Sequence, residues 1–522
     1  MDEFINRQLE LLYSSIPEAE ARLHPPAKVK SQMLTLMNGV KPINLLKPCR
    51  IGDGIIKIDE SKEKFLIELF ERACSAGRFT KFVPASGAAT RMFSKLQTTL
   101  NKYSNFDLEI LRVLSTEDRN AEATYRVLSN INLFAFYDDL KSALGDNVEN
   151  ILTSNPRKLI EKILFPDGLY YANKPKAVLK FHKYKNENRS AFTEHLIESY
   201  YYQKDVQNRI KIHFTISEEH KNYFDEEYGK FLNSKYFADA EYNLEYSYQN
   251  KSTDSIALNL NNEIYFDGND RPLFRPAGHG ALLENLNNLK GDLIFIKNID
   301  NVCVDRLKPV TVRYKKLLAG FLLLIQKQTF EYLTLLEQEK IPDNKIEEMI
   351  KFLEAFLNIP KPDGFNHWEV KKKKNFLFNK LNRPIRVCGV VKNEGQPGGA
   401  PFWVKNEDGE TSVQIVESAQ IDFNSEEQKL IFNNSTHFNP VDLVCAVKDF
   451  KGDNFNLMNF SDSKTSIIVR KIINGIEIKS LELPGLWNGA MSNWISVFVE
   501  VPIETFNPVK EIVDLLNPGH IE

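Results

Sequence analysis

Residues 78–96 have the sequence RFTKFVPASGAATRMFSKL, which predicts a strand, a tight loop and a helix in succession. Residues 79–83 favour a strand, residues 84–89 are nearly all small, and residues 90–92 lead into a helical pattern. Small residues let the backbone approach an anion, and the free N–H groups at a helix start attract negative charge. The layout is typical of a phosphate-binding loop, although packing alone also produces such turns. It matches neither a Walker loop nor a G-x-G-x-x-G dinucleotide loop.

The composition indicates a globular protein that acts on small molecules. The chain has 522 residues, of which 42% are hydrophobic and 26% charged, and this length predicts two or three structural units. A formal net charge of -3 provides no overall basic field for binding nucleic acid or an anionic membrane. We therefore expect small-molecule partners.

Cysteine usage and the N-terminal segment predict a cytoplasmic protein. The five cysteines are widely spread and show no C-x-x-C spacing, which argues against a disulfide framework or a zinc knuckle. The segment MDEFINRQLELL carries acidic residues where a signal peptide needs basic ones. The apolar run at 317–325 is well short of the roughly 20 residues that span a bilayer.

Strand and helix patterns alternate along the chain and predict an α/β fold. Strand patterns appear at residues 177–181, 209–215, 291–301, 385–391, 413–417 and 443–447. Such alternation favours a mixed, mostly parallel central sheet flanked by helices. We predict a helical N-terminal region over 1–76, a catalytic domain over 77–450 with helical insertions at about 95–165 and 305–380, and a C-terminal α+β region over 451–522.

Three further segments carry residues suited to nucleotide chemistry. Asp300 follows a buried strand, at the end of an open α/β sheet where ligands bind, which makes it the best candidate for holding a metal. Pro175 fixes the backbone between two lysines, although a solvated turn explains this Lys-Pro-Lys equally simply. The turn PAGHG at 276–280 opens the helix predicted at 281–289.

Together these segments resemble the UDP-sugar pyrophosphorylases, nucleotidyltransferases of the GT-A type. The loop VPASGAATRM is similar to the family loop at Ala85, Gly87, Thr90, Arg91 and Met92. The other similar motifs follow in the family's order: Pro175-Lys176, PAGHG at 276–280, NIDN at 298–301, IVE at 415–417 and TFNPVKEIVDLL at 505–516. The resemblance covers roughly residues 78–516 and implies a GT-A, Rossmann-like fold. A closer likeness, through VVKNEGQPGGAPFWV, STHFNPVDLV and LWNGAM, points to an uncharacterised bacterial domain-of-unknown-function family.

The resemblance implies a reaction between a nucleoside triphosphate, with UTP favoured, and a sugar 1-phosphate, releasing pyrophosphate. The catalytic cations would be Arg91, Lys176 and Lys510, with Lys510 supplied by the C-terminal region. The nucleotide would contact Ala85, Ser86, Gly87, Thr90, Gln249, Gly278, His279 and Gly280. His279 is either such a base contact or a packed turn histidine. The sugar would contact Glu417, Thr436, His437 and Asn439. Asp300 would hold Mg²⁺, with Asp442 as a second ligand or as a simple strand-edge aspartate.

Two other functions remain open at this point. A GT-A glycosyltransferase would use a nucleotide sugar and share the metal carboxylate, but it usually carries Asp-x-Asp, where this chain has Asn298-Ile299-Asp300. A non-catalytic nucleotide-sugar-binding protein is suggested by Ser86 and Ala89, which replace family glycines in the loop. The sequence does not identify the sugar, the base or the oligomeric state.

Overall fold

The computed structural model describes residues 1–145, 147–234, 236–395 and 398–522, which form a mixed α/β protein with a large, mostly parallel central sheet flanked by helices. The chain divides into two compact units, each built from three segments. The first unit comprises Met1–Phe70, Gln249–Ile294 and Leu318–Val501, and the second comprises Glu71–Tyr248, Phe295–Leu317 and Pro502–Glu522. Three elements run across this division: α4 (Glu60–Ser75), β12 (Leu293–Ile296) and α14 (Lys308–Leu336).

The first unit contributes five strands to the central sheet, in the order β2-β3-β19-β13-β16. Neighbouring strands are parallel except at β13–β16, which is antiparallel. Strand β13 has the sequence IRVCGVVK and is buried at every position but the last, as expected for a central strand covered on both faces. The unit's strands are β1 (Asn44–Pro48), β2 (Arg50–Ile51), β3 (Gly54–Ile56), β9 (Ser255–Ile256), β10 (Leu258–Asn259), β11 (Phe274–Arg275), β13 (Ile385–Lys392), β14 (Ala400–Lys405), β15 (Thr411–Val416), β16 (His437–Ala446), β17 (Ile467–Ile473), β18 (Ile476–Glu482) and β19 (Ile495–Glu500).

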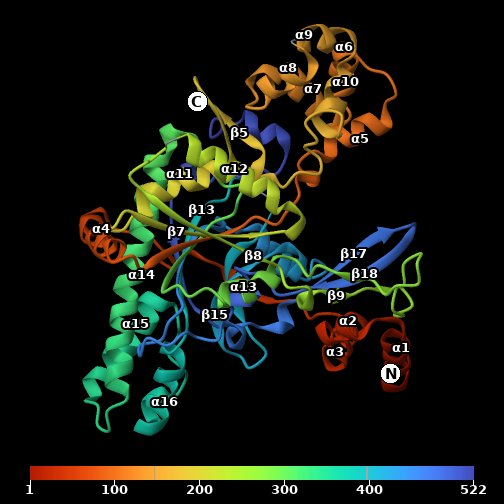
Figure 1. The fold of residues 1–522 in the computed structure, drawn as a ribbon. Coiled ribbons are helices and arrows are strands. Elements are labelled where there is room, and N and C mark those ends of the chain that lie inside the picture. Colours follow the sequence, from red (N-terminus) through yellow and green to blue (C-terminus); the bar gives the residue numbers. More distant parts are fainter. Residues whose placement is uncertain (146, 235, 396–397) are drawn as a thin grey trace. The chain divides into compact units, whose positions relative to one another are not determined.

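Helices and small sheets complete the first unit. Strands β1, β14 and β15 form one antiparallel sheet. Strands β10, β18 and β17 form another, in which β17 and β18 lie side by side (Figure 1). The N-terminal region 1–76, predicted to be helical, also contains the three short strands β1, β2 and β3. The unit's remaining helices are α1 (Asp2–Ser15), α2 (Glu18–Leu23), α3 (Pro26–Asn38), α13 (Leu282–Asn287), α15 (Asp343–Leu357), α16 (Val370–Leu381) and α17 (Glu426–Asn433).

The second unit contains a parallel sheet in the order β4-β7-β8, and the backbone leaving β12 continues it, because Lys297 N–H donates to the carbonyl of Phe82 in β4. Strand β4 therefore lies between β7, which is parallel to it, and the segment that leaves β12, and its carboxyl end opens directly into the loop at 85–91. The strands are β4 (Phe79–Pro84), β5 (Lys180–Lys183), β6 (Asn188–Ser190), β7 (Arg209–Ile216) and β8 (Glu241–Tyr248). The helices are α5 (Ser94–Lys102), α6 (Leu108–Leu114), α7 (Arg119–Ser129), α8 (Tyr137–Leu144), α9 (Val148–Ser154), α10 (Pro156–Leu164), α11 (Ala191–Gln203) and α12 (Lys221–Asn233).

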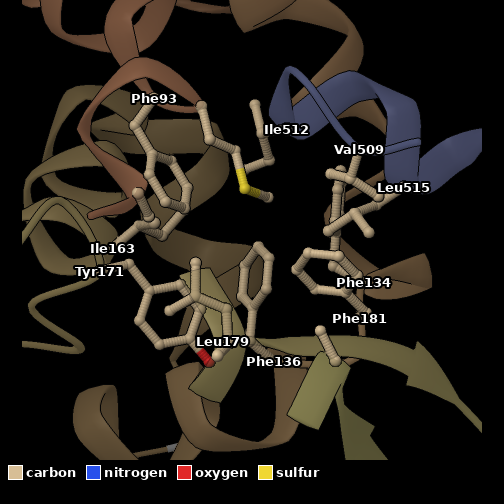
Figure 2. Close-up of a cluster of buried hydrophobic side chains, with 14 of the residues drawn as sticks. Phe93, Phe134, Phe136, Ile163, Tyr171, Leu179, Phe181, Val509, Ile512 and Leu515 are labelled. Carbon is tan, nitrogen blue, oxygen red and sulfur yellow. The ribbon is translucent and has the colours of Figure 1, made fainter. Parts of the chain in front are cut away.

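One hydrophobic core holds the second unit together. It joins residues from the helices α5 to α10, from the sheet and from the segment 509–515. Figure 2 shows Phe134, Phe136 and Tyr171 beneath Val509 and Ile512, so the last part of the chain packs onto the helical insertion. Removing these apolar side chains from water is the main stabilising contribution to the second unit. No helix in the described ranges combines the length and apolarity needed to cross a membrane.

Candidate functional site

Hydrogen bonds to neighbouring segments hold the backbone of the loop after β4. Ala85 N–H donates to the carbonyl of Thr215 at 2.9 Å, and Ser217 Oγ donates to the carbonyl of Ser86 at 3.0 Å. A short 3₁₀ turn, Ala89–Arg91, then leads into α5. The predicted succession of strand, loop and helix is therefore present.

The small residues of this loop face in two directions. Gly87 is exposed, and a Cβ added there would meet no atom within 4 Å. Ala89, by contrast, is fully buried and belongs to the hydrophobic core of the second unit. Its methyl group therefore points into the protein, and the replacement of a family glycine at this position leaves the exposed edge of the loop open.

Arg91 offers an unpaired cation beside the loop. Both Thr90 and Arg91 are exposed, and Thr90 Oγ1 donates to the carbonyl of Ala172 at 3.1 Å. The guanidinium of Arg91 has no ion pair or hydrogen bond with the part of the chain that the structure describes. A guanidinium fork without a protein partner is well suited to phosphate oxygens.

The Lys-Pro-Lys segment lies against the loop. Ala89 N–H donates to the carbonyl of Lys174 at 3.0 Å, and Lys176 N–H donates to the carbonyl of Gly87 at 3.2 Å. Pro175 forms an isolated bridge with Ala88. The backbone of the Lys-Pro-Lys segment is therefore hydrogen-bonded to the loop. This argues against the interpretation of residues 174–176 as a solvated turn without a further role.

Lys176, Asp300 and Lys510 meet at one point of the second unit. The ammonium groups of both lysines donate to the same oxygen, Oδ2 of Asp300, each at 3.1 Å. The carboxylate is buried, with 6% of the residue exposed, whereas the side chain of Lys510 is 64% exposed. Burial raises the pKa of Asp300, but the charges of Lys176 and Lys510 outweigh it and keep the pKa below its usual value.

The segment 507–510 is fastened to the end of β12. Asn507 N–H donates to Oδ1 of Asn301 at 2.8 Å, and Val509 N–H donates to the carbonyl of Asp300 at 3.2 Å. Lys176 Nζ in turn donates to the carbonyl of Val509 at 2.6 Å. The position of Lys510 is therefore set by the same strand end that carries Asp300.

Asp300 fits a cation site as a single oxygen ligand. Its second oxygen, Oδ1, is buried and has no hydrogen-bond partner among the described residues. Mg²⁺ prefers such hard oxygen donors and commonly takes its remaining ligands from substrate phosphates and water. Within the described ranges, no group of three or more His, Cys, Asp or Glu residues is arranged to hold a metal. A role for Asp300 in binding magnesium thus depends on a bound substrate.

The residues predicted to contact the base lie in the first unit. Gly278 has a φ of 72°, and a Cβ at Gly280 would lie 2.2 Å from the carbonyl oxygen of Pro484. His279 Nδ1 accepts from Leu486 N–H at 2.9 Å, and its ring stacks on Trp487. These contacts fix the position of the His279 ring, and its contact with a base stays a prediction. Gln249 Nε2 makes one long contact of 3.5 Å with Thr253 Oγ1, which leaves its amide largely available.

The residues predicted to contact the sugar also lie in the first unit. Glu417 caps a 3₁₀ turn in a reciprocal arrangement with Gln420 and accepts from Asn488. Thr436 Oγ1 and His437 Nδ1 are 2.9 Å apart, and His437 is buried with Nε2 3.5 Å from a carboxylate oxygen of Glu500. Burial lowers the pKa of His437.

Two further predicted residues lie on β16. Asn439 belongs to this strand, but its side chain falls outside the described residues. Asp442 is buried and pairs in register with Gly389 of β13. Asp300 and Asp442 belong to different units, so the role of Asp442 as a second metal ligand stays a prediction.

A buried charged cluster in the second unit was not predicted from the sequence. Glu194 is fully buried and lies 2.8 Å from His182 Nδ1 and 2.6 Å from Lys308 Nζ. His182 Nε2 is 2.9 Å from Nδ1 of His520, which is close to the segment 507–510. The two histidines are 338 positions apart in the sequence, so only the fold brings them together.

This cluster predicts a pH-dependent stability. Burial and the neighbouring His182 lower the pKa of His520 to about 3, compared with roughly 6.5 for an unfolded histidine. Between these values only the unfolded chain binds the proton, so this histidine's contribution to stability decreases as the pH falls from about 6.5 toward 3. We expect wild type to lose about 1–2 kcal/mol more than His520→Asn between about pH 7 and pH 4.5 in urea unfolding. Parallel losses in the two proteins would contradict the assignment to His520.

The comparisons with known proteins place the chain in a family. It is a mixed α/β protein with a strand–loop–helix segment and a lysine–aspartate–lysine centre. It belongs to the family described as Domain of unknown function (DUF4301), whose profile matches residues 15–521. This confirms the predicted membership in an uncharacterised family. A search of curated proteins gave no match.

Among solved structures, the chain is similar to two pyrophosphorylases. One is the UDP-N-acetylglucosamine pyrophosphorylase from Trypanosoma brucei in complex with an inhibitor, at 12% identity and a TM-score of 0.46, covering 98% of this chain and 81% of that one. Another is a variant of the UDP-glucose pyrophosphorylase from Leishmania major in complex with UDP-glucose, at 11% identity and a TM-score of 0.43, covering 97% and 78%. At such low identity, the function has to be inferred from the side chains of this chain.

Proposed function

We propose that the protein is a nucleotidyltransferase that joins a nucleoside triphosphate, with UTP favoured, to a sugar 1-phosphate. The observation that carries this proposal is the convergence of Lys176 and Lys510 on the buried Asp300, together with the backbone contacts between Lys176 and the exposed loop at 85–91. Two ammonium groups, a free guanidinium and an open loop suit a polyanion. The burial of Ala89 removes one of the two substitutions that favoured a non-catalytic binding protein.

The chemistry needs charge neutralisation more than proton transfer. An oxygen of the sugar phosphate attacks the α-phosphorus of the triphosphate, and the bond between the α-phosphorus and the bridging oxygen breaks to release pyrophosphate. A phosphate monoester with a second pKa near 6 is already ionised at neutral pH, so no general base is required. Arg91, Lys176 and Lys510 would orient the phosphates and offset the charge that develops on them.

Magnesium is proposed as the cofactor, with Asp300 as its protein ligand. When bound, Mg²⁺ would neutralise negative charge on the phosphates. In its absence Lys176 and Lys510 hold the carboxylate of Asp300 ionised and in place. The roles of Gln249 and Gly278–Gly280 toward the base, and of Glu417, Thr436, His437 and Asn439 toward the sugar, are part of the same proposal.

The test is a panel of the four nucleoside triphosphates against several sugar 1-phosphates with Mg²⁺, with pyrophosphate release as the readout. We expect release with at least one pair, and UTP to be the best donor. If every pair fails and no nucleotide raises the thermal stability of the protein, the proposal is wrong. Release of a nucleoside diphosphate from a nucleotide sugar, without pyrophosphate, would instead identify a glycosyltransferase.

A matched pair of lysine variants shows whether the activity belongs to this centre. Lys510→Met removes a cation bonded to Asp300 and should lower kcat about 100-fold, as is typical when one charge-stabilising group is lost. Lys185→Met makes the same change at an exposed lysine of the second unit and should leave kcat unchanged. Equal activity of the two variants would place the chemistry elsewhere.

A further inference from the structure

The first unit contains a large cleft at the beginning of strands β13 and β19. Its volume is about 1140 Å³, and all of its lining residues belong to the first unit. Arg383 comes just before β13, and Trp494 and Ser496 lie at the start of β19, which pairs with β13 in parallel. None of the residues assigned to the proposed reaction lines this cleft.

Two arginines at this end of the strands form no ion pair with a carboxylate among the described residues, although Glu410 acts on Arg383 at longer range. Arg386 is fully buried, and its Nε donates to Oγ of Ser496, a cleft-lining residue, at 2.7 Å. Its Nη1 donates to the carbonyl of Trp487, while its Nη2 has no partner. Arg383 itself lines the cleft, is half-buried, and donates only to backbone carbonyls, at 2.7 Å to Asn379 and 3.5 Å to Asn493. An uncompensated buried cation is costly, so an anion nearby would be stabilising.

Neutral donors at the same place also lack partners. Trp494 is 4% exposed, and its Nε1 has no hydrogen-bond acceptor among the described residues. The hydroxyl of Ser492, two residues before it, is buried and equally unpartnered. Most buried polar groups in native proteins are satisfied. Three such donors, on residues 386, 492 and 494, therefore stay unsatisfied on or directly behind the cleft lining.

The charges around the cleft are cationic on balance. Six lysine and arginine side chains line it, against four carboxylates. Glu410 is already paired with Lys380 at 2.9 Å, and Glu407 with Lys41 and Lys464. Lys405 makes no ion pair with the described residues. The remaining lining includes many hydroxyl and amide side chains, such as Ser412, Gln414 and Asn493.

We infer that this cleft is a second binding site, for a small phosphorylated and hydroxyl-bearing metabolite. Arg383 and Lys405 would contact the phosphate. Arg386 lies behind the lining, bonded to Ser496, and its positive charge would attract the phosphate without contact. The serine, glutamine and asparagine side chains would contact the hydroxyl groups. The volume is somewhat above the roughly 300–1000 Å³ found for ligand pockets, enough for a molecule of nucleotide or hexose phosphate size. This site shares no residue with the proposed transferase site, whose lysine–aspartate–lysine centre belongs to the second unit.

Isothermal titration with fructose 6-phosphate tests the inference. Its phosphate is not on the anomeric carbon, so it is not a sugar 1-phosphate and does not report on the proposed reaction. We expect saturable binding to one site per chain, and no binding of fructose. Arg383→Gln and Lys405→Gln should each weaken binding about tenfold, since each removes one charge-assisted contact. Both positions are at least partly exposed, so these variants should fold normally.

Two controls separate this site from others. Arg470→Gln removes an exposed arginine of the same unit outside the cleft lining, and Lys510→Met alters the proposed transferase centre. Both should bind fructose 6-phosphate as wild type does. The inference is overturned if fructose 6-phosphate, inorganic phosphate and AMP all fail to bind at millimolar concentration, or if Arg383→Gln binds unchanged. Loss of binding in Lys510→Met would also overturn it, because the ligand would then occupy the transferase centre.

Discussion

Replacing Asp300 by alanine is expected to lower pyrophosphate release about 1000-fold while leaving the fold intact. The carboxylate accepts from both Lys176 and Lys510 through one oxygen, and its other oxygen is the buried, unpartnered atom proposed for Mg²⁺. Alanine removes both functions at once, and losing a preorganised charge of this kind typically costs a few kcal/mol of the activation barrier. The measurement is kcat with the best substrate pair at saturating Mg²⁺.

Asp300→Asn is the matched comparison. It preserves the size of the side chain but removes the negative charge, so the two ammonium groups lose their ion pairs while the packing is kept. We expect it to be nearly as impaired as Asp300→Ala, with circular dichroism and the unfolding midpoint close to those of wild type. Full activity of Asp300→Ala would mean that the magnesium assignment is wrong.

Replacing Phe136 by alanine is expected to destabilise the second unit by about 3–5 kcal/mol, the usual cost of removing a fully buried aromatic ring. Phe136 is 1% exposed, stacks on Phe134 with ring centroids 5.0 Å apart, and meets Tyr171 edge to face at 5.4 Å. Figure 2 places this ring beneath Val509 and Ile512, on either side of Lys510 in the sequence. Urea unfolding measures the loss of stability.

Phe165→Ala serves as the control for Phe136→Ala. Phe165 follows α10 and is 42% exposed, so the same change removes little buried surface. A loss of stability below about 1 kcal/mol is expected there. Similar losses at the two positions would show that the ring of Phe136 is not part of a well-packed core.

Much of the second unit could be predicted from local sequence patterns. The strand before the loop, the strand at 209–215 and the helical insertion near 95–165 correspond to β4, β7 and the helices α5 to α10. These elements have strong periodicity, which depends only on neighbouring residues. The run at 177–181 was less well predicted, because residues Lys176–Val178 form a 3₁₀ turn and the strand β5 begins at Lys180. A mostly apolar run of five residues, AVLKF, does not distinguish a strand from a turn.

The candidate site was predictable only where its residues belong to short motifs. Asp300, Lys176 and Lys510 each lie in a recognisable segment, and the structure brings all three together, although their catalytic roles stay predictions. The pairing of His182 with His520 has no local signal, since it depends on long-range packing. The capping role of Glu417 could not be anticipated either, because it requires knowing that β15 ends at Val416.

The lysine–aspartate–lysine centre also has a consequence for how the second unit folds. Its backbone contacts join residues 87–89, 174–176, 300–301 and 507–510, four segments separated by long stretches of chain. Contacts between such distant segments form only after the entropy of closing the intervening loops has been overcome. The centre should therefore be completed late in folding, and a partly folded chain that already holds its local helices would lack the proposed phosphate contacts.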